Sequence, residues 1–222
     1  MRRNLSLAPV LVMTRIAAIL SVAAVALVLG GTALLVWSGR GADPCGGGTV
    51  AGGLDSIGGP FTLVNGDGAT VTDADVIDGP TLIYFGYTFC PDVCPFDAAR
   101  NAQVVDLLAE RNIDVTPVFV TVDPARDTPD ILAEYTAYMH EDMIGLTGTE
   151  EQVNKAKQAY RVYAQRRGSD DATYLMDHTV FSYLVVPHQG TLAFYRGAPG
   201  PAGGGQTAQE VADDIACQLS LV

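Results

Sequence analysis

A charge-free apolar run near the N-terminus, residues 16–36, most constrains what this chain can fold into. Its sequence is IAAILSVAAVALVLGGTALLV, and no charged residue lies between Arg15 and Arg40. Because about 20 apolar helical residues span the hydrocarbon core of a bilayer, the run predicts a single transmembrane helix over 16–38. Trp37 suits the interfacial end of such a helix. The globular part of the protein must therefore be built from the residues that follow.

The charges on either side of the run predict its orientation. The first 40 residues hold four of the 13 basic residues and none of the 25 acidic ones, so the remainder has 9 basic against 25 acidic residues. Because cytoplasmic flanks are enriched in Arg and Lys, we expect residues 1–15 in the cytoplasm. The domain is then on the periplasmic, or intermembrane-space, side of an inner membrane. A cleaved signal peptide is the alternative, but the run is long for one and no Ala-x-Ala site precedes Asp43.

Composition divides the rest of the chain into a tether and a domain. Residues 39–56 are rich in glycine and predict a flexible tether. Residues 57–222 are long enough for one domain with its own core. The strongly acidic balance argues against a nucleic-acid partner, which would select for Lys and Arg stripes.

Apolar runs and helix-capping signals alternate along the domain. The expected elements are a hairpin (61–64 and 69–72), a strand (81–87), a helix (97–110), a strand (115–122), helices at 128–139 and 149–165, strands at 179–186 and 191–195, and a helix at 207–219. One βαβ unit followed by an antiparallel ββα unit predicts a mixed sheet with helices on both faces. This is an α/β fold of the thioredoxin-like kind.

Cys90 and Cys94, in the sequence Cys-Pro-Asp-Val-Cys-Pro, lie where a buried strand leads into a helix. A helix N-terminus presents free N–H groups and partial positive charge, which favour thiolate over thiol. Three residues separate the two cysteines, one more than in thioredoxin-type redox pairs. The wider spacing makes a disulfide between the two cysteines less favourable. It suits two sulfurs that bind one ion between them. A plain disulfide or two buried thiols is the alternative.

His178 is the candidate third ligand, because a thioredoxin-like sheet brings the start of its third core strand near the first helix N-terminus. Two thiolates and one imidazole form a soft site that favours copper(I), with copper(II) left open, whereas zinc usually has four ligands. Asp92 and Asp177 are candidates to orient the loop or the imidazole; a helix cap and a solvated turn acid are the alternatives. His140 and His188 are expected on the surface.

Four segments together resemble the Sco/SenC family of copper chaperones, in the same order and spacing over roughly residues 57–220. They are Tyr84-Phe-Gly-Tyr-Thr-Phe-Cys-Pro-Asp-Val-Cys-Pro95, Val122-Asp-Pro-Ala-Arg-Asp-Thr-Pro129, Tyr160-Arg-Val-Tyr163 and Asp177-His-Thr179. The resemblance implies a membrane-tethered, thioredoxin-like protein of cytochrome c oxidase assembly. It also implies that Cys90, Cys94 and His178 bind copper and deliver it to the binuclear CuA site of oxidase subunit II, from an upstream donor that the sequence does not name.

An enzymatic alternative uses the same cysteine pair. Cys90 and Cys94 would then be the catalytic residues of a thiol–disulfide oxidoreductase that reduces the cysteines of the oxidase copper site. We expect a copper-delivery protein rather than an enzyme, with this activity kept open.

Two further features do not involve the candidate metal ligands. Cys45, before the domain, and Cys217, in the last expected helix, are predicted to form a disulfide that ties the tether to that helix. Free thiols or an intermolecular bridge are the alternatives. Residues 123–129 match a signature of the family and are interpreted as a strand-end turn and helix cap. Arg126 can pair there with a nearby carboxylate, and no catalytic role is assigned.

Overall fold

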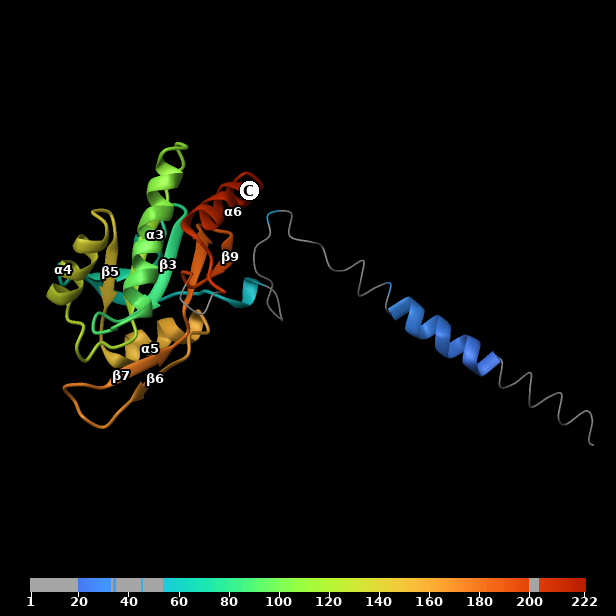
Figure 1. Ribbon diagram of the computed structural model, residues 1–222, viewed down its shortest axis with the longest axis horizontal. Coiled ribbons are helices and arrows are strands. Elements are labelled where there is room, and N and C mark those ends of the chain that lie inside the picture. The colour runs from blue at the N-terminus through green and yellow to red at the C-terminus, as the bar shows by residue number, and fades with distance from the viewer. Residues whose placement is uncertain (1–19, 33, 35–44, 46–53, 200–203) are drawn as a thin grey trace, which may run out of the picture. The chain divides into compact units, whose positions relative to one another are not determined.

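The computed structural model in Figure 1 describes residues 20–32, 34, 45, 54–199 and 204–222. The chain divides into two compact units, Met1–Pro44 and Cys45–Val222. In the first unit, residues 20–32 are helical and exposed. Within the described residues, no helix has the length and apolar character needed to cross a membrane. The predicted segments 1–15, 16–38 and 39–56 lie wholly or partly outside the described residues, so these assignments stay predictions.

A seven-stranded mixed sheet forms the centre of the second unit. Its strand order is β2-β1-β5-β4-β3-β8-β9. The strands are β1 (Thr62–Asn65), β2 (Thr70–Thr72), β3 (Thr81–Gly86), β4 (Thr116–Thr121), β5 (Ile144–Thr147), β8 (Phe181–Val186) and β9 (Gly190–Arg196). β3, β4 and β5 are parallel, whereas the other pairings are antiparallel. Every position of β3 is buried, as expected of a central strand covered on both faces.

Helices cover both faces of this sheet. They are α2 (Asp73–Val76), α3 (Val93–Ala109), α4 (Pro129–Met139), α5 (Glu150–Ala159) and α6 (Ala208–Leu219), with a short 3-10 helix η1 (Leu54–Ser56). Right-handed crossovers from β3 to β4 and from β4 to β5 place α3 and α4 on the same face. There Phe119 packs between Tyr84 and Tyr135 of α4, with ring centroids 5.8 and 5.1 Å apart. On the opposite face, Phe85 packs against Tyr160, which follows α5, at 5.4 Å.

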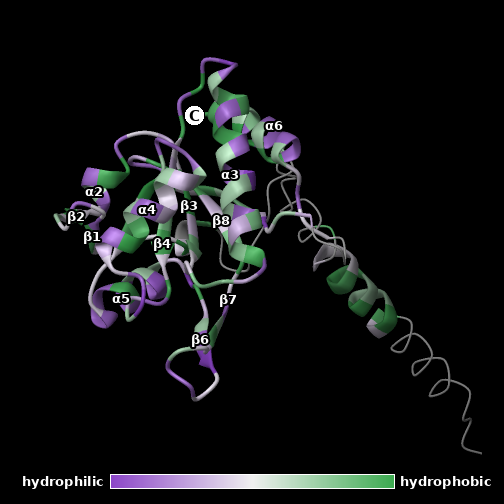
Figure 2. Cartoon of the chain, turned by 60° about the vertical axis from the view of Figure 1, so that its left-hand side comes forward, coloured by the Kyte–Doolittle hydropathy of each residue, from purple (hydrophilic) through white to green (hydrophobic). Residues whose placement is uncertain are grey.

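The hydrophobic core forms two clusters. One fills most of the sheet interior, and the other packs Val211 and Ile215 of α6 against Leu82 and Leu184. In Figure 2 the hydrophobic colouring gathers on the sheet strands, whereas α5 shows much hydrophilic colouring. The predicted mixed sheet flanked by helices is confirmed.

The disulfide between Cys45 and Cys217 is present, with a sequence separation of 172 residues and Cα atoms 5.6 Å apart. It joins the start of this unit to α6, as the sequence analysis predicted. Cys90 and Cys94 are free.

The secondary structure differs from the prediction in the region that carries the candidate histidine. The helix expected to reach residue 165 ends at Ala159, because the chain turns at Arg161, which has a φ of 53°. β6 (Ala164–Arg167) follows and pairs antiparallel with β7 (Leu175–His178) in a separate two-stranded sheet. That hairpin was not predicted. α3 also begins four residues before the expected start, at Val93.

Candidate metal centre

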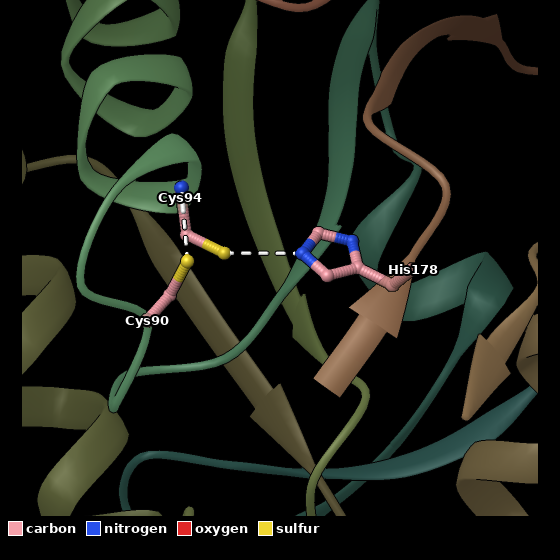
Figure 3. Close-up of side chains that lie close together, drawn as sticks. All are labelled: Cys90, Cys94 and His178. Carbon is pink, nitrogen blue, oxygen red and sulfur yellow. Dashed lines mark hydrogen bonds between the residues drawn. The ribbon is translucent and has the colours of Figure 1, made fainter. Parts of the chain in front are cut away.

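Three residues from separate segments meet beside the N-terminus of α3. Cys90 lies in the loop after β3, Cys94 in the first turn of α3, and His178 at the end of β7. Their two Sγ atoms and a ring nitrogen all lie within 4.8 Å of one another. His178 Nε2 is 3.2 Å from Cys94 Sγ, and the Cys94 N–H donates to Cys90 Sγ at 3.4 Å (Figure 3). In the part of the chain that the structure describes, no other His, Cys, Asp or Glu group has such metal-binding geometry.

The two cysteines have opposite protonation tendencies. The hydrogen bond from the Cys94 side chain lowers the pKa of Cys90 to about 3, against the opposing effect of burial. The His178 side chain and the N–H groups of Asp92 and Cys94 add to the lowering. The same hydrogen bond, the burial of Cys94 and the charge on Cys90 raise the pKa of Cys94. The metal-free pair therefore holds one thiolate and one thiol. A thiolate is the reactive form for both metal binding and disulfide exchange.

The imidazole of His178 is oriented by its backbone neighbour. Nδ1 lies 2.8 Å from the carbonyl oxygen of Thr179. Because a carbonyl can only accept, Nδ1 carries a proton, and Nε2 is the ring nitrogen that faces Cys94 Sγ. The rings of Tyr84 and Tyr87 pack edge-on against the imidazole, with centroids 6.3 and 5.7 Å away. The sequence pattern did not predict these contacts, although both tyrosines lie in the segment that resembles the family.

The two candidate orienting acids, Asp92 and Asp177, lie beside the ligands in the sequence. Asp92 is the N-cap residue of α3 but its side chain makes no capping hydrogen bond. Asp177 precedes His178 in β7, so its side chain is on the opposite face of that strand. It forms an ion pair with Arg167 at 3.3 Å. Their proposed roles toward the ligands stay predictions.

Comparisons with known proteins fix the family. The sequence profile of the SCO1/SenC family matches residues 50–216. The chain belongs to this family. It is 54% identical over 167 residues to protein SenC of Rhodobacter capsulatus, across 75% of this chain and 72% of that protein. It is 40% identical over 144 residues to the mitochondrial SCO1 homolog 1 of Arabidopsis thaliana, across 64% of this chain and 43% of that protein.

Two similar solved structures are described as having copper bound. Arabidopsis thaliana ScoI is 35% identical, with a TM-score of 0.68, and the match covers 75% of this chain and 99% of that one. Bradyrhizobium japonicum ScoI is 36% identical, with a TM-score of 0.61, and the match covers 73% and 99%. These likenesses confirm the predicted family and the mixed α/β fold.

Proposed function

We propose that this protein binds copper(I) through the sulfurs of Cys90 and Cys94 and the Nε2 of His178, and carries it to a target protein. The observation that carries the proposal is the convergence of these three atoms within 4.8 Å. Two thiolates and an imidazole are soft ligands that suit copper(I). Zinc usually has four ligands, and no fourth His, Cys, Asp or Glu joins this group among the described residues.

The exposure of the site supports delivery of copper rather than permanent storage. Cys90 is partly exposed, whereas Cys94 is buried, so an incoming ligand can replace Cys90 first while Cys94 and His178 hold the ion. Beside the cysteines, the large apolar side chains of Phe89 and Phe96 are 50% and 63% exposed. Exposed apolar groups gathered at one place are typical of surfaces that bind another protein.

We further propose that the target is the CuA site of subunit II of cytochrome c oxidase. The support is the family membership and the chaperone function that the sequence resemblance implies. With the predicted anchor at 16–38, the domain would act on the periplasmic or intermembrane-space side of an inner membrane. The upstream copper donor is not assigned.

A thiol–disulfide oxidoreductase is the second candidate, favoured by the low pKa of Cys90. The Cys90 thiolate would attack a disulfide of the target and form a mixed disulfide. That attack releases the first target thiolate. Cys94 would then lose its proton and attack Cys90, which releases the second target thiolate and leaves a Cys90–Cys94 disulfide. Two electrons pass from the pair to the target, and an external dithiol must then reduce the pair again.

Anaerobic copper(I) titration of the full chain, followed by X-ray absorption, tests the first proposal. We expect one copper with two sulfur ligands and one nitrogen ligand. Cys90→Ser and Cys94→Ser should abolish tight binding, and His178→Ala should remove the nitrogen. His140→Ala, whose imidazole contacts Asp106 instead, is the matched control. A four-sulfur signal, or a His178→Ala variant with unchanged ligation, would contradict the proposal. If the cysteine variants lose thiol exchange but copper still reaches the target, the result would favour the oxidoreductase.

A further inference from the structure

The turn after β4 contacts both segments that carry the metal ligands. We propose that Arg126 in this turn is a positioning residue, which holds the β6–β7 hairpin against the cysteine loop so that His178 reaches Cys94. The inference rests on the proposed ligand set. It gives the 123–129 signature a role beyond the turn, helix cap and carboxylate pairing that the sequence predicts.

On the hairpin side, Arg126 forms a closed set of contacts with Asp123 and Tyr174. Its Nη1 donates to the carbonyl oxygen of Tyr174 at 2.9 Å, and its guanidinium carbon lies 3.6 Å from the centroid of the Tyr174 ring. The Tyr174 hydroxyl donates to Asp123 Oδ1 at 2.7 Å, and Arg126 Nε donates to Asp123 Oδ2 at 2.6 Å. Asp123 and Tyr174 are only 4% and 6% exposed, so water competes little for these bonds. Tyr174 directly precedes β7, which ends at His178.

On the cysteine side, the same guanidinium lies over two aromatic rings. Its carbon is 4.7 Å from the centroid of Phe89 and 5.9 Å from that of Tyr87, both within the range of cation–π attraction. Phe89 directly precedes Cys90, and Tyr87 packs edge-on against His178 at 5.7 Å. Arg126 therefore contacts the neighbours of both the sulfur ligands and the nitrogen ligand.

The next residue, Asp127, fixes the base of the cysteine loop. Its carboxylate accepts from Thr88 N at 3.1 Å and from Thr88 Oγ1 at 2.6 Å, and Asp127 is fully buried. The loop is thus held independently of Arg126. Loss of Arg126 should release the histidine side and leave the cysteine side in place.

The hairpin needs such contacts because it is separate from the main sheet. β6 and β7 pair only with each other in the described part of the chain, and an isolated two-stranded hairpin is marginally stable. A planar guanidinium can donate in its plane to Asp123 and to the Tyr174 carbonyl while its faces contact aromatic rings. A lysine ammonium cannot make both kinds of contact at once.

A double-mutant cycle of Arg126→Ala and His178→Ala tests this role by copper(I) affinity and X-ray absorption. Loss of a group that orients a ligating histidine typically lowers metal affinity on the order of ten- to a hundredfold. We expect such a loss for Arg126→Ala alone, with the nitrogen contribution reduced and both sulfurs kept. In the His178→Ala background, Arg126→Ala should change affinity by no more than about twofold, because the group it positions is already gone.

Arg126→Lys keeps a charge beside Asp123 and serves if the alanine variant does not fold; it too should lose nitrogen ligation. Arg111→Ala is the matched control, because Arg111 pairs with Asp213 on the surface at 2.8 Å, and it should change neither affinity nor ligation. Equal affinity losses in both backgrounds, or unchanged nitrogen ligation in the Arg126 variants, would overturn the inference alone. A His178→Ala variant with full affinity would instead overturn the ligand set, and the inference with it.

Discussion

Copper(I) binding at pH 7.5 should release about one proton from the site, because one sulfur is already a thiolate. The pKa of Cys90 is lowered to about 3 by the hydrogen bond from Cys94, so Cys90 has no proton to lose. The pKa of Cys94 is raised by that same hydrogen bond and by burial, so Cys94 still carries its proton. Nδ1 of His178 donates to the carbonyl oxygen of Thr179, so it keeps its proton when Nε2 binds copper(I). Copper(I) therefore displaces the proton of Cys94 alone.

The alternative of two ordinary thiols gives a clearly different number. With a pKa of about 8.5 each, they would release about 1.8 protons together at pH 7.5. Because protons and copper(I) compete for the sulfurs, affinity rises with pH, and the slope of log affinity against pH equals the number of protons released. The slope should stay near one between pH 7 and 9, since Cys94 titrates above its ordinary range. For ordinary thiols it would begin near two and fall through this window.

Anaerobic calorimetry measures the proton count directly. Copper(I), supplied as its acetonitrile complex, is titrated into the protein at pH 7.5 in buffers of different ionisation enthalpy, and the slope of the observed heat gives the protons released. A count near two would refute the preformed thiolate. Cys94→Ala provides the matched control in the metal-free protein: the pKa of Cys90, followed by thiolate absorbance, should rise because its main hydrogen-bond donor is gone. A pKa that stays low in this variant would contradict the assigned cause.

Three further substitutions test the fold by guanidinium unfolding. Cys217→Ser opens a 172-residue loop and should lower the free energy of unfolding by up to about 5 kcal/mol without a change in copper(I) affinity; unchanged stability would contradict this. Asp127→Ala removes the acceptor of three hydrogen bonds from Thr88 and Thr121 and should cost roughly 3–5 kcal/mol. Gly86→Ala would put a Cβ 2.7 Å from the Tyr84 ring and should cost about 1–3 kcal/mol through overpacking; a neutral result would mean that the ring can move aside.

Local signals predicted the elements that they directly specify. The Asn-Gly-Asp-Gly turn at 65–68 predicted the β1–β2 hairpin, and the capping residues Thr128 and Thr207 predicted where α4 and α6 begin. The cysteine pair was correctly expected at the junction of a buried strand and a helix, because the apolar run of β3 and the spacing are both local in sequence.

Elements whose stability comes from distant contacts could not be predicted in this way. β6 has the sequence AQRR, with no apolar alternation, and one of its arginines, Arg166, stacks on Tyr174 with its guanidinium carbon 4.0 Å from the ring centroid. β5 has only four residues, too few for a periodic pattern. The orientation of His178 depends on a backbone carbonyl at Thr179, and no side-chain pattern specifies such a group.

The Cys45–Cys217 bridge also decides how the protein responds to a pulling force. Tension applied between the chain ends passes through the sulfur–sulfur bond and bypasses everything between these cysteines. A segment of 172 residues, roughly 600 Å when fully extended, would then bear none of the force. This segment includes every strand of the sheet and all three candidate ligands. That segment could extend only after the bridge is reduced. The bridge therefore carries an applied force past the candidate metal site.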